Sequence, residues 1–227
     1  RTGIYASGLQ TELSAPLFWG VVPENLKALV AKKLAEKVKA DGGMDVGLLG
    51  SKTILNALSE HGYADLAYSL ASRETYPSWG WWIKNGATTL YENWKIEGSS
   101  DISLNHIMFG EIGAWYYKAL GGIFPDPLSP GFKNTLLKPN FVTGLNAFEA
   151  KHESPYGTLV SSWKKIGNKV KYEIAVPPNA SASLEIKAKS MKNEKANSVT
   201  AHSKFEQSNG VIKAVLPSGS YKLSIEL

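Results

Sequence analysis

The chain has 227 residues, of which 43% are hydrophobic and 20% are charged, and this composition allows one large core or two modest ones. It contains no run of about 20 apolar residues and no cysteine, so a membrane-spanning helix, a disulfide and a thiolate metal site are not expected. The formal net charge of +5 comes from lysines after residue 122; they alternate along predicted strands, and this pattern argues against a nucleic-acid partner, for which arginine is preferred.

Amphipathic helices are predicted for the first half. In Asn25–Lys39 apolar residues recur at three- and four-residue spacing after Pro23, which is typical of a helix with one buried face. Ser51–Glu60 and Tyr63–Glu74 predict a helical hairpin joined at Gly62, because glycine accepts the left-handed conformation that ends a helix.

One further helix is predicted from Ser103 to Leu120, stopped by Gly121 and Gly122. Its expected buried face consists of Leu104, Met108, Ile112, Trp115 and Leu120.

After Ile123–Pro127 the apolar period changes from about 3.6 to two. Lys169–Val176 and Tyr221–Leu227 alternate apolar and polar residues, as half-buried strands do. Short runs of this kind continue to the end of the chain and predict an antiparallel β-sandwich. The fold is therefore expected to be α+β, with one domain over residues 1–122 and a second over residues 123–227.

The first residues, Arg1–Tyr5, contain no initiator methionine and no signal-peptide features. We interpret this end as a cut edge within a longer protein.

An aromatic segment, Glu74–Trp94, holds four of the seven tryptophans. Rings beside carboxylates and amides suit a carbohydrate site, because the C–H faces of a sugar stack on rings while its hydroxyls need directional partners. The alternative is that these tryptophans fill a core, since tryptophan is highly buried on average. The density of rings and the Gly86–Thr89 break favour the carbohydrate site for the group as a whole.

Two polar residues stand out in and after this segment. Glu92, between Tyr91 and Trp94, is a candidate general base, and the alternative is an exposed glutamate at a helix start. His106 lies near the start of the last predicted helix, where a lone histidine is more often structural than functional. The four histidines are far apart in sequence, so neither a metal site nor another cofactor is expected.

Several stretches resemble glycoside hydrolase family 78, the bacterial α-L-rhamnosidases, in the same order. The most specific of these are Tyr76–Gly80 (YPSWG), Gly86–Trp94 (GATTLYENW) and Ser103–Gly110 (SLNHIMFG). Others are Leu58–Tyr68 upstream and Ser154–Trp163 and Val176–Ala180 downstream, so the resemblance covers most of the chain to about residue 187. Two features depart from the family pattern: Tyr91 stands where tryptophan is usual, and the Lys95–Asp101 linker is short.

The resemblance implies the last helices of an (α/α)6 catalytic barrel followed by a C-terminal β-sandwich. It implies that Glu92 is the general base of an inverting hydrolysis of terminal α-L-rhamnosyl residues. It also implies sugar contacts by His106, and we add Asn105, Trp79 and Trp94 to the expected substrate-binding residues.

The family's general acid lies in earlier barrel helices that these residues do not include, so the chain alone is expected to be inactive. The expected partners are a rhamnose-containing glycan or glycoside and the missing N-terminal part of the same protein, in a periplasmic or secreted setting. Two alternatives remain open: a non-catalytic carbohydrate-binding protein, and an (α/α)6 glycosidase with another sugar specificity.

Overall fold

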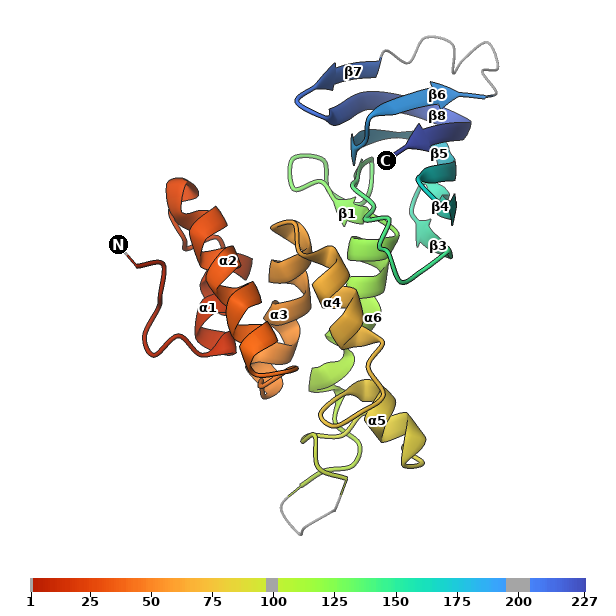
Figure 1. The fold of residues 1–227 in the computed structure, drawn as a ribbon. Coiled ribbons are helices and arrows are strands. Elements are labelled where there is room, and N and C mark those ends of the chain that lie inside the picture. The colour runs from red at the N-terminus through yellow and green to blue at the C-terminus, as the bar shows by residue number, and fades with distance from the viewer. Residues whose placement is uncertain (1, 97–101, 195–204) are drawn as a thin grey trace. The chain divides into compact units, whose positions relative to one another are not determined.

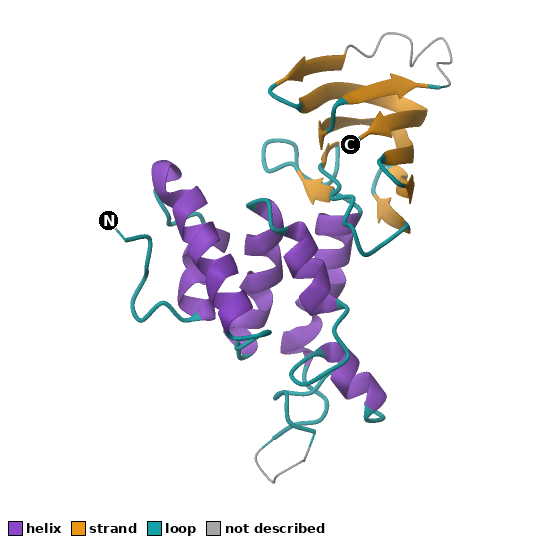
Figure 2. Cartoon of the chain, in the orientation of Figure 1, coloured by secondary structure: helices purple, strands orange, loops and turns teal. Residues whose placement is uncertain are grey.

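The computed structural model describes residues 2–96, 102–194 and 205–227. The chain forms two compact units, Arg1–Trp115 and Tyr116–Leu227. The first is helical and the second is built from strands after one initial helical turn (Figure 2). This confirms the predicted fold class of helices followed by a curled, sandwich-like sheet. Among the described residues, no helix combines the length and the apolar character that crossing a bilayer requires.

The helical unit is arranged around one central helix (Figure 1). The central helix, α3, is buried along almost its whole length and is contacted by α1, α2, α4 and α6. The elements are α1 (Gln10–Phe18), α2 (Glu24–Ala40), α3 (Leu48–Glu60), α4 (Ala64–Ala71), α5 (Trp79–Lys84), the 3₁₀ helix η1 (Ile107–Gly110) and α6 (Glu111–Trp115).

The predicted helices over Asn25–Lys39 and Ser51–Glu60 are confirmed, and the hairpin between α3 and α4 turns at Gly62 with a φ of 90°. The second helix of that hairpin ends at Ala71, earlier than the predicted Glu74. The sequence reading did not identify α1, which contains Pro16, or the six-residue α5.

The single helix predicted over Ser103–Leu120 is wrong at its start. Helical structure begins only at Ile107 and continues as α6 and then the π-helical turn η2 (Tyr116–Leu120). Residues 103–106 are not helical, because their backbone is hydrogen-bonded to Leu90 and Glu92. Consequently Leu104 and Met108, two residues of the predicted buried face, are 39% and 49% exposed, and Phe109 is buried instead.

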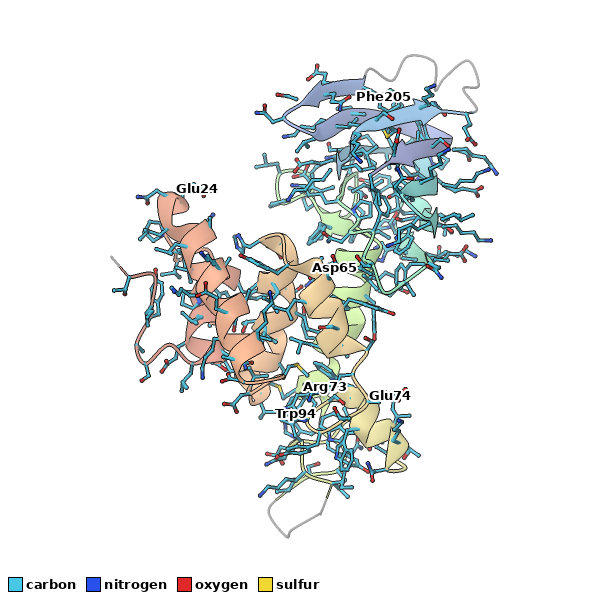
Figure 3. The ribbon with its side chains drawn as sticks, in the orientation of Figure 1. Glu24, Asp65, Arg73, Glu74, Trp94 and Phe205 are labelled. Carbon is cyan, nitrogen blue, oxygen red and sulfur yellow. The ribbon has the colours of Figure 1, made fainter. Side chains whose placement is uncertain are left out.

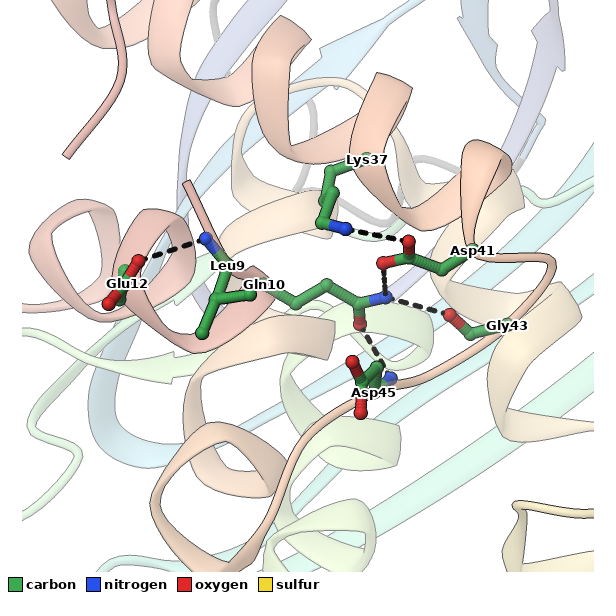
Figure 4. A network of polar contacts seen from close by, with 7 residues as sticks. All are labelled: Leu9, Gln10, Glu12, Lys37, Asp41, Gly43 and Asp45. Carbon is green, nitrogen blue, oxygen red and sulfur yellow. Dashed lines mark hydrogen bonds and ion pairs between the residues drawn. The ribbon is translucent and has the colours of Figure 1, made fainter. Parts of the chain in front are cut away.

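A polar network around the buried Gln10 side chain fixes the turn between α2 and α3 (Figure 4). The Gln10 side chain, 1% exposed, donates to Asp41 Oδ2 (2.8 Å) and to the Gly43 carbonyl (2.9 Å), and its Oε1 accepts the Asp45 N–H (2.9 Å). Asp41 also accepts a hydrogen bond from Lys37 Nζ at 2.7 Å. The bond from Lys37 has the largest effect on the pKa of the Asp41 carboxyl and lowers it, and the bond from Gln10 lowers it further. The turn that leads into α3 is thus held by side chains from two other helices.

The second unit contains one eight-stranded sheet that curls upon itself. Its strands are β1 (Ile123–Pro125), β2 (Asn134–Leu137), β3 (Ala147–Ser154), β4 (Gly157–Ile166), β5 (Lys169–Lys187), β6 (Ser190–Asn193), β7 (Phe205–Ser208) and β8 (Val211–Glu226).

The sheet curls along its two long strands, β5 and β8. β5 and β8 pair along their length with a register shift between Val176 and Ser181, where Asn179 has a φ of 60°. On either side of this irregularity β5 meets different neighbours: β4 before it and β2 after it. Inward residues of both halves, such as Tyr172 and Leu184, then share one core. The pairing is antiparallel as predicted, except that β2 and β5 run parallel.

Candidate functional site

The residues singled out by the sequence lie in one part of the helical unit, residues 73–96 and 102–110, which we call the aromatic lobe. The Ser78 hydroxyl caps α5 by accepting the Trp81 N–H at 3.0 Å. Gly80 lets α5 lie directly against the preceding chain, since a Cβ at this position would be 2.3 Å from the Arg73 carbonyl oxygen. The Tyr76–Gly80 stretch therefore has a structural role: Ser78 caps the start of α5, and Gly80 allows α5 to pack against the preceding chain.

Four rings form the interior of the lobe: Trp79, Trp82, Trp94 and Phe109. Ring centroids are 5.1 Å apart for Trp79 and Trp94, 4.8 Å for Trp82 and Trp94, and 4.5 Å for Trp94 and Phe109. Most of these pairs meet edge to face, the arrangement that aromatic quadrupoles favour. Figure 3 labels Trp94 in this lobe together with Arg73 and Glu74.

Each of the three buried tryptophans donates its indole N–H to a backbone carbonyl. Trp79 donates to Phe109 (3.0 Å), Trp82 to Trp94 (3.0 Å), and Trp94 to Val46 (2.7 Å). A buried N–H must find a partner, and here the partners lie on three different segments, of which that of Phe109 is η1. The rings therefore connect α5, the segment of Trp94, η1 and the turn before α3.

Glu92 lies on a segment whose backbone is hydrogen-bonded to residues 103–106, a short pairing that we call the ladder. Its N–H donates to the Ser103 carbonyl at 3.0 Å, and one carboxylate oxygen accepts the Ser103 N–H at 2.9 Å. The side chain is partly exposed, and within the described part of the chain no lysine or arginine forms an ion pair with it. A carboxylate held at one oxygen and open to solvent can accept a proton from water.

The same ladder carries His106. The His106 N–H donates to the Leu90 carbonyl at 2.7 Å, and the Thr89 hydroxyl bonds to the Leu104 carbonyl. His106 is partly buried, whereas Asn105 is exposed and its N–H donates to the Ser103 hydroxyl at 3.1 Å. The structure thus brings Glu92, Asn105 and His106 onto two segments that are hydrogen-bonded to each other, although these residues are up to 14 positions apart in sequence.

Trp79 and Trp94 are interior residues, 6% and 7% exposed, with their indole N–H groups already bonded. Packing is their role in the described structure, and a direct contact with a sugar stays a prediction for both. The core-filling alternative considered for single tryptophans accounts for these two.

Sequence reasoning did not single out Trp82, Tyr91 or Ser103 as functional, yet they hold the loop of Glu92. The density of rings pointed to Trp82 and Tyr91, and Ser103 begins the Ser103–Gly110 stretch of the family resemblance. The short Lys95–Asp101 linker lies largely outside the described residues. In the ranges that the structure describes, no three His, Asp or Glu side chains are grouped so that they could hold a metal ion.

An open groove of about 600 Å³ lies in the second unit and contains none of the predicted site residues. Charged side chains of opposite sign pair with one another in its lining: Lys138 and Lys213 both lie close to Glu185, at 3.8 and 3.2 Å. The aromatic lobe therefore remains the candidate site.

Comparison with known proteins identifies the relatives of both units. Residues 1–120 match the bacterial α-L-rhamnosidase six-hairpin glycosidase domain, and residues 122–201 match the bacterial α-L-rhamnosidase C-terminal domain. An α-L-rhamnosidase of Formosa agariphila is 37% identical over 185 residues, which are 78% of this chain and 20% of that protein.

Solved structures agree with these matches. The α-L-rhamnosidase of Dictyoglumus thermophilum superposes with a TM-score of 0.85 at 29% identity. The match covers 100% of this chain and 26% of the Dictyoglumus chain. The Streptomyces avermitilis α-L-rhamnosidase, solved in complex with L-rhamnose, gives 0.86 at 26% identity, with coverages of 98% and 22%. The chain thus spans about a fifth to a quarter of the length of the relatives it matches.

Proposed function

The chain belongs to the bacterial α-L-rhamnosidases, and from this we propose that it is the C-terminal part of an inverting enzyme that removes terminal α-L-rhamnosyl residues. In this proposal residues 1–122 complete the catalytic barrel and residues 123–227 form the following sandwich domain. The observation that carries the catalytic assignment is the Glu92 carboxylate, fixed by the Ser103 N–H at 2.9 Å and partly open to solvent.

Glu92 acts as general base. It takes a proton from a water molecule whose oxygen attacks the anomeric carbon, while a general acid on the opposite face protonates the leaving glycosidic oxygen. The bond to the aglycone breaks as the new C–O bond forms, and the configuration inverts. The two carboxyl groups of such a pair lie roughly 6.5–9.5 Å apart so that a water molecule fits between base and sugar.

We assign the general acid to a part of the full-length protein outside these 227 residues. Loss of proton donation typically costs about 10²–10⁴ in rate. The 227-residue chain by itself is therefore expected to release no rhamnose. Release that disappears in a Glu92→Gln variant of this isolated chain would contradict the assignment.

Sugar contacts are assigned to His106 and Asn105, which share the ladder of Glu92. Trp79 and Trp94 stay candidates for contact at the edge of the pocket, with packing as the role that their burial supports.

The test is release of rhamnose from p-nitrophenyl α-L-rhamnoside by the full-length protein and by its Glu92→Gln variant. A Glu74→Gln variant is the matched control, because Glu74 lies in the same lobe but is 63% exposed and pairs with Lys84 on the surface. We expect only Glu92→Gln to lose orders of magnitude in kcat, and NMR of the first product to show the β-anomer. Rhamnose binding without turnover by the folded full-length protein would support the carbohydrate-binding alternative instead, and activity on another glycoside alone would support a different specificity.

A further inference from the structure

Trp82 is anchored to the chain on both sides of Glu92. On one side the Tyr91 ring packs on the Trp82 ring, with centroids 5.5 Å apart. On the other side the Trp94 carbonyl accepts the Trp82 indole N–H at 3.0 Å, and the Trp94 ring lies 4.8 Å from that of Trp82. The loop that carries Glu92 is therefore attached at both flanks to one side chain.

Trp82 is itself rigidly held. It is 2% exposed and lies on α5, whose start is capped by Ser78 and whose close approach to residue 73 is allowed by Gly80. It also packs edge to face on Phe109, with centroids 5.2 Å apart. Because the ring is excluded from solvent, it is not exposed to contact a sugar, and any effect on the reaction must pass through the residues it holds.

The other two buried tryptophans of the lobe do not share this geometry. Trp79 donates to Phe109, on the segment after His106, and Trp94 donates to Val46, before α3. Within the described residues, Trp82 is the tryptophan whose ring contacts the residue before Glu92 and whose N–H holds a carbonyl after it.

We propose that Trp82 is a positioning residue for Glu92, which sets the direction of the carboxylate by fixing the backbone at Tyr91 and Trp94. The proposal rests on the proposed function, in which Glu92 is the general base. Small displacements of a catalytic group are costly, since a misplacement of about 1 Å can lower the rate about 10²-fold.

The experiment is a double-mutant cycle in the full-length protein with p-nitrophenyl α-L-rhamnoside. Trp82→Phe keeps a ring but removes the N–H that holds the Trp94 carbonyl. Trp163→Phe is the matched control, because Trp163 is 1% exposed and likewise donates to one backbone carbonyl, that of Leu120 at 2.8 Å, but lies in the second unit.

We expect Trp82→Phe to lower kcat about 10- to 100-fold with little change in KM, because the base acts only in the transition state. In the Glu92→Gln background the same substitution should lower kcat further by no more than about twofold, since the group it positions is gone. Trp163→Phe should leave kcat within about twofold of the parent enzyme.

Amide hydrogen exchange gives a readout that does not depend on activity. Trp82→Phe should speed exchange at the Glu92 and His106 amides, which form the ladder, whereas Trp163→Phe should not. If Trp82→Phe does not fold, Tyr91→Leu, which removes the ring on the other flank, replaces it in the same cycle with the same expected non-additivity.

Equal losses in both backgrounds, a kcat like that of Trp163→Phe, or unchanged exchange in the ladder would each overturn the positioning role while leaving the general base intact. If Glu92→Gln alone retains the parent kcat, Glu92 is not the general base and the proposed function fails. The positioning role is then overturned as well. The single variants therefore distinguish the two failures.

Discussion

The Trp94 indole N–H donates to the Val46 carbonyl at 2.7 Å, so the loop that carries Glu92 is attached to the turn that leads into α3. Val46 is 6% exposed, and its carbonyl would lose a buried partner in a Trp94→Phe variant. We expect that variant to lower the free energy of unfolding by about 1–3 kcal/mol. Urea unfolding of the full chain measures this, and amide exchange of residues 41–47 should become faster. Unchanged stability and exchange together would show that the bond does not hold the turn.

Gln10→Leu should destabilise the helical unit by about 1–3 kcal/mol, because the Gly43 carbonyl loses a buried partner and the Asp45 N–H loses a partly buried one. Lys32→Leu in α2 is a suitable control, since its side chain is 63% exposed and its contact with Glu36 is a long surface pair. Urea midpoints of the two variants give the comparison. Equal midpoints would mean that the network in Figure 4 contributes nothing beyond packing.

Gly80→Ala should lower the free energy of unfolding by about 1–3 kcal/mol, because the new Cβ would meet the Arg73 carbonyl and α5 would have to move. The matched control is Gly113→Ala in α6, where a Cβ meets nothing within 4 Å. There the same change should be neutral or stabilising by up to about 1 kcal/mol, since alanine favours helix. A Gly80→Ala protein as stable as the Gly113→Ala protein would show that α5 tolerates displacement.

Stability should fall as the pH drops from about 7 towards 5, in part through His61. Burial first, and then the nearby Lys27, lower the pKa of His61 below 6.5, while Glu24 acts in the opposite direction. Because the folded pKa is the lower one, the unfolded chain binds the proton first, and the contribution is complete only above the unfolded pKa. A His61→Gln variant should have a flatter profile in urea unfolding between these pH values, and identical slopes for the two proteins would refute the role of His61.

Much of the architecture could be predicted from the sequence, because apolar spacing reports which side of an element is buried. The period of Asn25–Lys39 predicted α2, and the alternation at Val170, Tyr172 and Ile174 predicted a strand whose inward residues are each at most 2% exposed. The family resemblance likewise depended on local stretches such as Tyr76–Gly80, whose capping serine and close-packed glycine act within a few residues.

Only the tertiary structure decided whether each aromatic ring of this segment is buried in the interior or exposed. Composition predicted an aromatic site at Glu74–Trp94, but whether Trp94 faces a sugar or the interior depends on the Val46 carbonyl, 48 residues away. The start of the last helix was likewise set by long-range pairing, because hydrogen bonds to Leu90 and Glu92 keep residues 103–106 out of the helix that their pattern predicts. Periodicity records how a segment meets its own neighbours along the chain, whereas these contacts join segments that only folding brings together.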